Sequence, residues 1–141
     1  MKGKAHQQKL QQQELVLTAD TIVWFENNAL CKPKNEAHAI EMLSKLSGET
    51  HEVITSVCLS SKEKQTCIHE TTKVSMAVLL KADIIHYAKT YKPLDKAGGY
   101  GIQDWIGLIG ISKILGSYTN VLGLPTEKTY QLLLPYLSSI K

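Results

Sequence analysis

The chain has 141 residues, of which 43% are hydrophobic and 21% charged, a composition typical of one soluble globular domain. The net charge is +3, and the 16 basic residues, all lysine, are dispersed among 13 acidic residues. A nucleic-acid groove usually has a basic stripe with arginine contacts, and a membrane-spanning helix needs roughly 20 consecutive apolar residues. The sequence therefore argues against nucleic acid and membrane as partners.

Residues 1–13 are polar and glutamine-rich, so we expect a remnant helix or a tail there and a single domain over residues 14–141. No apolar segment follows the basic start, which is not typical of a secretory signal, and the cytoplasm is the expected location. The cysteines are Cys31, Cys58 and Cys67. An odd number without a CxxC motif predicts thiols in a reducing compartment rather than a disulfide or a zinc site.

The predicted elements begin with an apolar run at residues 15–19, typical of a strand buried on both faces. Residues 22–25 continue in an extended conformation toward a turn at residues 27–28, which predicts a hairpin or a bulged strand. A helix is predicted next. Asn35 is a suitable N-cap, apolar residues follow at helical spacing, and Gly48 stands where a helix C′ residue belongs.

The second half of the chain mixes both kinds of element. Residues 51–60 and 66–76 alternate in polarity around a polar turn, which predicts a β-hairpin. Residues 81–90 predict a helix that ends before a proline. Residues 106–115 are apolar with two internal glycines and predict a strand that bends or is closely approached. A last helix follows, which Pro135 should kink or end. The order predicts an α/β fold.

Three polar segments follow apolar stretches. Residues 94–103 combine an acid, a base, three glycines and an amide, so their backbone can approach a ligand while a few side chains select it. Asp20 and Thr21 end the first apolar run, and Lys32 and Lys34 flank a proline shortly afterwards. These segments predict one anion-binding cleft, since a few lysine point charges suit a small polyanion.

Together these segments resemble the Maf family of nucleotide pyrophosphatases. The matching residues are 19–21, 32–34, 46–48 with 50, 51 and 53, 95–98 with 100–103, and 118 with 120, 121 and 123–125. The resemblance covers about residues 14–137. It implies an elongated, mixed β-sheet with flanking helices and a cleft, similar to inosine triphosphate pyrophosphatases. It also implies hydrolysis of nucleoside triphosphates to the monophosphate and pyrophosphate. Residues 100–103 resemble the branch that acts on dTTP and UTP.

Asp20 is the first candidate for the catalytic residue. It is predicted at the carboxyl end of a buried strand, where α/β folds place their sites. A carboxylate there can accept a proton from water or hold Mg²⁺, and the matching residue of the family is the proton acceptor. The resemblance implies a divalent cofactor, Mg²⁺ or Mn²⁺. Asp95 is either a second metal ligand beside Asp20 or a salt-bridge partner of Lys96.

The remaining candidate residues divide by ligand group. Thr21 and Gln103 resemble the positions that set base selectivity in the family, because a hydroxyl and an amide can pair with the edge of a pyrimidine. Lys32, Lys34 and Lys96 are candidate phosphate contacts, although surface lysine is the commoner role of this residue type. The resemblance implies a nucleoside triphosphate substrate and a homodimer.

Departures from the family keep an alternative open. Family members begin with a strand and a Ser-x-Arg-Arg or Ser-x-Arg-Lys turn that faces the phosphates, and this sequence has no such turn and no arginine. We therefore expect either a truncated enzyme or a catalytically impaired protein that binds nucleotides or regulates. Asp104 and Trp105 stand where glycine usually follows the glutamine, a change that can reshape the base pocket.

Overall fold

The computed structural model describes residues 14–137, so the tail or helix predicted for residues 1–13 lies outside the described residues. Five strands form one sheet in the order β2-β1-β3-β4-β5, and each pairing is antiparallel. The strands are β1 (Val16–Phe25), β2 (Asn28–Leu30), β3 (Thr50–Ser60), β4 (Gln65–Met76) and β5 (Ile111–Leu115). The helices are α2 (Glu36–Leu46), α3 (Lys81–Tyr91), α4 (Trp105–Gly110), α5 (Tyr118–Val121) and α6 (Thr126–Leu137), with a 3-10 turn η1 (Ala97–Gly99).

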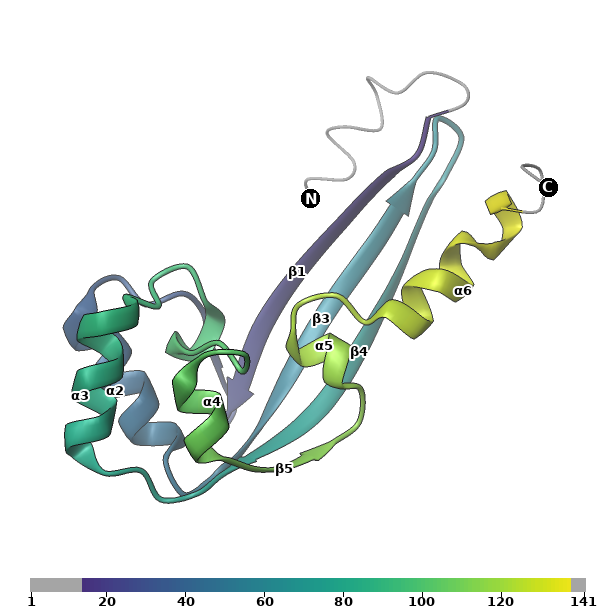
Figure 1. The fold of residues 1–141 in the computed structure, drawn as a ribbon. Coiled ribbons are helices and arrows are strands. Elements are labelled where there is room, and N and C mark those ends of the chain that lie inside the picture. The colour runs from purple at the N-terminus through teal and green to yellow at the C-terminus, as the bar shows by residue number, and fades with distance from the viewer. Residues whose placement is uncertain (1–13, 138–141) are drawn as a thin grey trace.

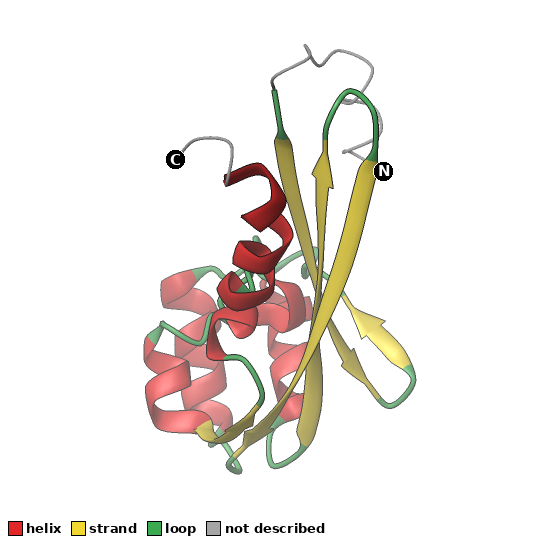
Figure 2. Ribbon diagram, turned by 90° about the vertical axis from the view of Figure 1, so that its right-hand side faces the viewer, coloured by secondary structure: helices red, strands yellow, loops and turns green. Residues whose placement is uncertain are grey.

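The molecule is elongated along its three long strands (Figure 1). Helices α2, α3 and α4 gather at one end of the sheet, and α6 lies toward the other end (Figure 1). In the perpendicular view, the helices lie on one side of the sheet (Figure 2). The predicted α/β class, with an elongated sheet and flanking helices, is confirmed, and all strand pairings in the described part of the chain are antiparallel.

Strand alternation in β3 explains which face of the sheet carries the helices. His51, Val53, Thr55 and Val57 are each no more than 2% exposed, whereas Ser56 between them is exposed. Residues two apart in a strand point to the same face, so this row faces the helices. The predicted hairpin is confirmed, because β3 and β4 pair along their whole length.

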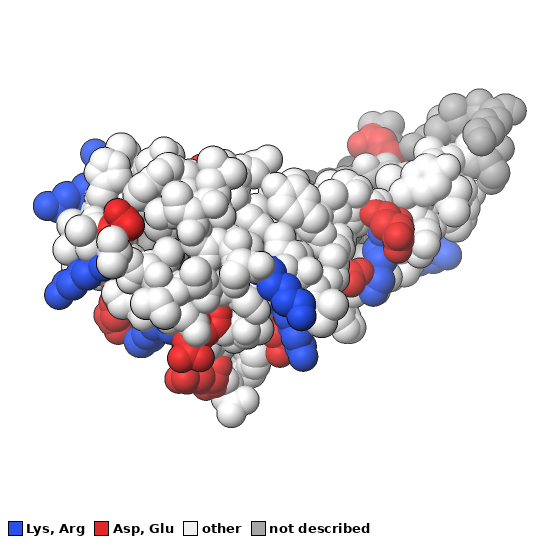
Figure 3. Space-filling model, turned by 60° about the horizontal axis from the view of Figure 1, so that its bottom comes forward, with Lys and Arg blue, Asp and Glu red and all other residues white. Residues whose placement is uncertain are grey.

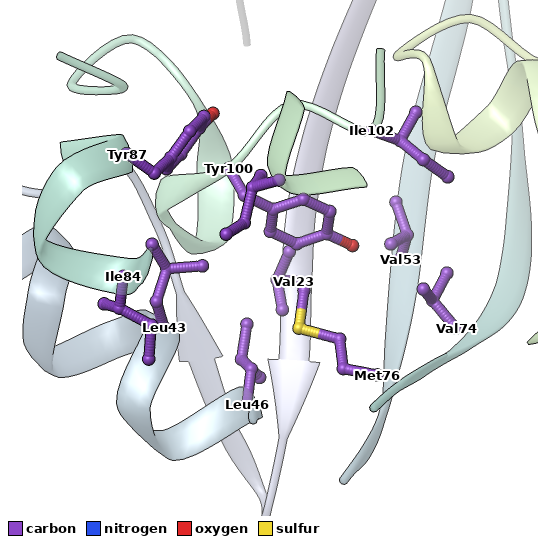
Figure 4. Packing of buried hydrophobic residues seen from close by; sticks show 11 residues of the cluster. Val23, Leu43, Leu46, Val53, Val74, Met76, Ile84, Tyr87, Tyr100 and Ile102 are labelled. Atoms are coloured by element: carbon purple, nitrogen blue, oxygen red, sulfur yellow. The ribbon is translucent and has the colours of Figure 1, made fainter. Parts of the chain in front are cut away.

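The core fixes the helical end of the molecule to the sheet. Leu43 and Leu46 of α2 and Ile84 and Tyr87 of α3 are almost fully buried and belong to one cluster with residues of β1, β3 and β4. Figure 4 shows Tyr100 between the helices and these strands. The segment that follows η1 is therefore anchored in the core. Predicted helix α2 is confirmed with its N-cap, where the side chain of Asn35 accepts from the His38 N–H at 2.8 Å.

Two predictions about local structure are wrong. Residues 15–19 are not buried on both faces: Leu17 is 39% exposed, because β1 pairs with β2 only from Val23 onward and its start lies at the edge of the sheet. Residues 106–115 are not one strand. The first part forms α4, in which Ile106, Gly107 and Gly110 are buried. These residues recur about one helical turn apart, so a helix turns all three toward the core.

The cysteine prediction is wrong for two of the three residues. Cys58 and Cys67 form a disulfide, and their Cα atoms are 4.1 Å apart. They lie directly opposite each other on β3 and β4, a relation that comes from the register of the hairpin and not from any motif. Cys31 is a free, exposed thiol.

The charged side chains are interspersed. On the face shown in Figure 3, lysines and acidic residues alternate over a largely uncharged surface, without a continuous basic strip. Within residues 14–137, no helix is long and apolar enough to span a bilayer.

Candidate active site

A cavity of about 310 Å³ opens where β1, the segment after β2, the η1 loop and the end of α5 meet. A volume of this order lies at the lower end of the range for small-molecule sites. Its lining is polar in character and drawn from distant parts of the sequence. The charged and amide residues that line it are Asp20, Lys32, Asp95, Lys96, Gln103 and Asp104.

The structure brings together most of the residues that the sequence singled out. Asp20 and Thr21 of β1 border the same cavity as Gln103, and Lys32 and Lys96 border it as well. Residues of the three separate segments therefore border one cavity, and the binding of an anion there stays a prediction.

Lys34 differs from the other predicted residues. It is not among the residues that line this cavity, and its backbone N–H donates to Nδ1 of His38 at 3.0 Å. Its predicted phosphate contact stays a prediction.

Asp20 lies within a strand rather than at its end, contrary to the prediction. Neighbouring strand residues point to opposite faces, yet Ala19, Asp20 and Thr21 all border the cavity. This is possible because, among the strands that the structure describes, β1 has no partner on one side before Val23, so the cavity reaches around the strand edge. Asp20 is exposed, and water can reach its carboxylate.

The η1 loop approaches β1 closely because it contains glycine. Gly98 has a φ of +74°, and a Cβ built there would lie 2.8 Å from a methyl group of Val23. Its N–H donates to the carbonyl of Cys31 at 3.2 Å. The positive φ and the close approach to Val23 require glycine. Together with the backbone hydrogen bond, they hold Asp95 and Lys96 beside the cavity. These two side chains form a loose ion pair of 3.9 Å, and the Asp95 side chain is 78% exposed.

A buried tyrosine fixes the turn that carries Gln103. The Tyr87 hydroxyl donates to Oδ2 of Asp104 at 2.6 Å and accepts from the Gly101 N–H at 3.1 Å. Burial, and secondly the hydrogen bond to Asp104, raise the pKa of the Tyr87 phenol, which keeps it a donor at neutral pH. Asp104 therefore borders the cavity with its carboxylate already engaged. Sequence reasoning missed this role, since no motif links the two residues.

A second network lies beneath Thr21. The hydroxyl oxygens of Thr21 and Thr55 are 2.9 Å apart, and the Thr55 hydroxyl donates to the Asn120 carbonyl at 3.3 Å. The buried Asn120 amide donates to the Val53 carbonyl at 3.0 Å and to the Thr72 hydroxyl at 2.9 Å. The sequence predicted a strand at Thr55 but no role for it at the site.

His51 and Tyr100 form a buried pair behind the cavity wall. Nε2 of His51 lies 2.6 Å from the Tyr100 hydroxyl, and Tyr100 borders the cavity. Burial lowers the pKa of His51 to about 4 and raises the pKa of Tyr100. Both groups are therefore neutral near pH 7, in agreement with a structural role.

We expect the stability of the fold to decrease between pH 7 and pH 4.5. The unfolded chain protonates His51 near pH 6.5, whereas the folded chain does so only near pH 4. The unfolded state therefore binds more protons in this pH range, and the free energy of unfolding should fall by about 2 kcal/mol. Urea unfolding of wild type and of His51→Gln at several pH values measures this decrease. The variant should lose that part of the pH dependence, and equal pH dependence in both proteins would contradict the assignment.

Comparison with known proteins gives a consistent result. The family described as "Maf-like protein" matches residues 1–135. A protein of Flavobacterium psychrophilum named dTTP/UTP pyrophosphatase is 55% identical over 134 residues, which cover 95% of this chain and 69% of that protein. Proteins with the same name from Bacteroides fragilis and Christiangramia forsetii are 50% and 49% identical. They match 92% and 99% of this chain, over 67% and 71% of their own lengths.

Proposed function

Because the chain belongs to the family of Maf-like proteins, we propose that it is a pyrophosphatase that hydrolyses dTTP and UTP to the monophosphate and pyrophosphate. The observation that carries this proposal is one cavity lined by a water-accessible carboxylate, two lysines and a hydroxyl–amide pair. These groups suit water activation, phosphate binding and base recognition respectively. The names of the relatives support the same reaction.

Asp20 serves as the general base. Its carboxylate takes a proton from water as the water oxygen bonds to the α-phosphorus, and the bond to the bridging oxygen breaks to release pyrophosphate. Phosphoryl transfer depends mainly on positioning and on stabilising the developing negative charge. Lys32 and Lys96 supply positive charge beside the cavity, where they would contact the phosphates.

Asp20 and Asp95 would hold a divalent cation, Mg²⁺ or Mn²⁺. Both carboxylates border the cavity, and Mg²⁺ commonly binds through one or two carboxylates together with substrate phosphates. Residues 14–137 contain no gathered group of three or more His, Cys, Asp or Glu side chains, so phosphate oxygens would have to complete the coordination. When bound, such an ion neutralises charge on the phosphates.

Thr21 and Gln103 recognise the base. They reach the cavity from β1 and from the turn that Tyr87 fixes. A site that pairs its polar groups with the edge of a base discriminates strongly against bases that leave those groups unpaired.

The direct test is pyrophosphate release by the purified protein with MgCl₂ or MnCl₂ from UTP, dTTP, CTP, ATP and GTP. We expect release from UTP and dTTP above the other three. Absence of release from all five with either metal would overturn the proposed function.

The lysines give a graded prediction. Lys32→Ala and Lys96→Ala should each raise KM for UTP by roughly 10- to 100-fold, because a lost charge-assisted phosphate contact costs about 1.5–3 kcal/mol. Lys34→Ala, a matched change two residues from Lys32, should change KM by less, since Lys34 lies outside the cavity lining. Steady-state kinetics on the three variants measure this. An equal effect of Lys32 and Lys34 would instead place both on the phosphates.

We also propose a cytoplasmic location, where nucleoside triphosphates are available. The Cys58–Cys67 disulfide argues in the other direction, since structural disulfides are rare in reducing compartments. Thiol trapping of the protein in freshly lysed cells would determine whether this pair is reduced in place.

A further inference from the structure

Hydroxyl groups link the cavity to the buried end of α5. Thr21 and Thr55 are directly paired on β1 and β3, and Thr55 has no exposed surface. Beyond Thr55 lies the Asn120 carbonyl, which also accepts from the Gly123 N–H at 2.9 Å. Asn120 is itself fully buried and held through its amide. The inner end of this link is therefore fixed.

The number of hydrogens available determines which hydroxyl donates and which accepts in this link. Each threonine hydroxyl has one hydrogen to donate, and a carbonyl oxygen only accepts. The Thr55 hydrogen is thus used on the Asn120 carbonyl, and Thr55 accepts from Thr21. This is the assignment in which both contacts are hydrogen bonds. It leaves the Thr21 oxygen with acceptor capacity alone on its cavity side.

An acceptor at this position distinguishes the pyrimidine bases. The ring nitrogen N3 carries a hydrogen in uracil and thymine, whereas in cytosine it carries a lone pair. Gln103 cannot make this distinction by itself, because an amide can rotate to present either its oxygen or its NH₂ group. A hydroxyl whose single hydrogen is held in the core can.

Building on the proposed function, we propose that Thr55 is a positioning residue. It holds Thr21 as a hydrogen-bond acceptor, and so makes the site select a base with a ring N–H over cytosine. Thr55 does not border the cavity, so it acts through Thr21 and makes no contact with the base.

The test replaces the Thr55 hydroxyl with a methyl group of similar shape. Calorimetry measures the Kd of wild type and Thr55→Val for the non-hydrolysable α,β-imido analogues of UTP and CTP with MgCl₂. Wild type should prefer the uracil analogue. In Thr55→Val the Thr21 hydrogen is released and can turn to a base acceptor, so the preference should fall about tenfold. Thr55→Ser keeps the hydroxyl and should retain the preference.

The ratio of the two Kd values separates positioning from general damage. If Thr55 had only a structural role, Thr55→Val would weaken the binding of both analogues equally and leave the ratio unchanged. That result would overturn the proposal, and so would a wild-type protein that binds both analogues equally well. If Thr55→Val does not fold, Thr55→Cys replaces the hydroxyl that accepts from Thr21 with a weakly accepting thiol, and a loss of preference in the same direction is expected. Selective binding by wild type without pyrophosphate release would refute the proposed function while leaving this inference standing.

Discussion

Replacing Asp20 with asparagine should lower kcat for pyrophosphate release from UTP by about 10³-fold, within the range of a general base in enzyme catalysis. The amide keeps the shape of the side chain but cannot take a proton from water. Because Asp20 is exposed at a strand edge, the change should leave the thermal midpoint within about 2 °C of wild type, as surface substitutions usually do. Enzyme-coupled detection of pyrophosphate and a thermal melt measure both effects.

Glu26→Gln is the matched control. Glu26 is an exposed acid in the turn after the same strand and does not line the cavity, so its substitution changes charge equally and should leave kcat unaffected. Full activity in Asp20→Asn would remove Asp20 as the base. Equal losses in both variants would attribute the effect to net charge instead.

Gly107→Ala should destabilise the protein by about 4 kcal/mol or more, the upper end of single-substitution effects. A Cβ built at Gly107 would lie 2.0 Å from the Ile102 carbonyl oxygen and 2.6 Å from its carbon. Both are backbone atoms, which cannot rotate away as a side chain can. To accommodate the methyl group, α4 must separate from the segment that carries Gln103, next to Ile102 in the sequence. Denaturant unfolding measures the loss.

Leu108→Ala controls for a change in the same helix. Leu108 is 80% exposed, so its truncation should alter stability by no more than about 0.5 kcal/mol. If Gly107→Ala folds with wild-type stability, the tight packing of α4 against Ile102 is not required. A folded Gly107→Ala protein with altered base preference would show instead that this packing positions Gln103.

The exposed edge of β1 has a consequence for both variants. Within residues 14–137, the part of β1 before Val23 has no strand partner on one side, and an unpaired, partly apolar edge is prone to association with other chains. Melts and kinetics should therefore be recorded at several protein concentrations.

The sequence by itself determined the local elements and the chemical types of the site. Alternation defined the β3–β4 hairpin, helical spacing with Asn35 and Gly48 defined α2, and residue types marked Asp20 and the lysines. Such signals can be read from the sequence because they depend on residues that are neighbours within one helical turn or one strand. The same residue types, in their order along the chain, carry the resemblance to the Maf family.

Only the tertiary structure decided how these elements are partnered. The Thr55–Asn120 hydrogen bond joins residues 65 positions apart, and the Cys58–Cys67 pairing follows from strand register. The fold of residues 105–110 as a helix depends on how closely Gly107 approaches Ile102. Each of these contacts depends on strand register or packing geometry, which the pattern of residue types along the chain does not encode.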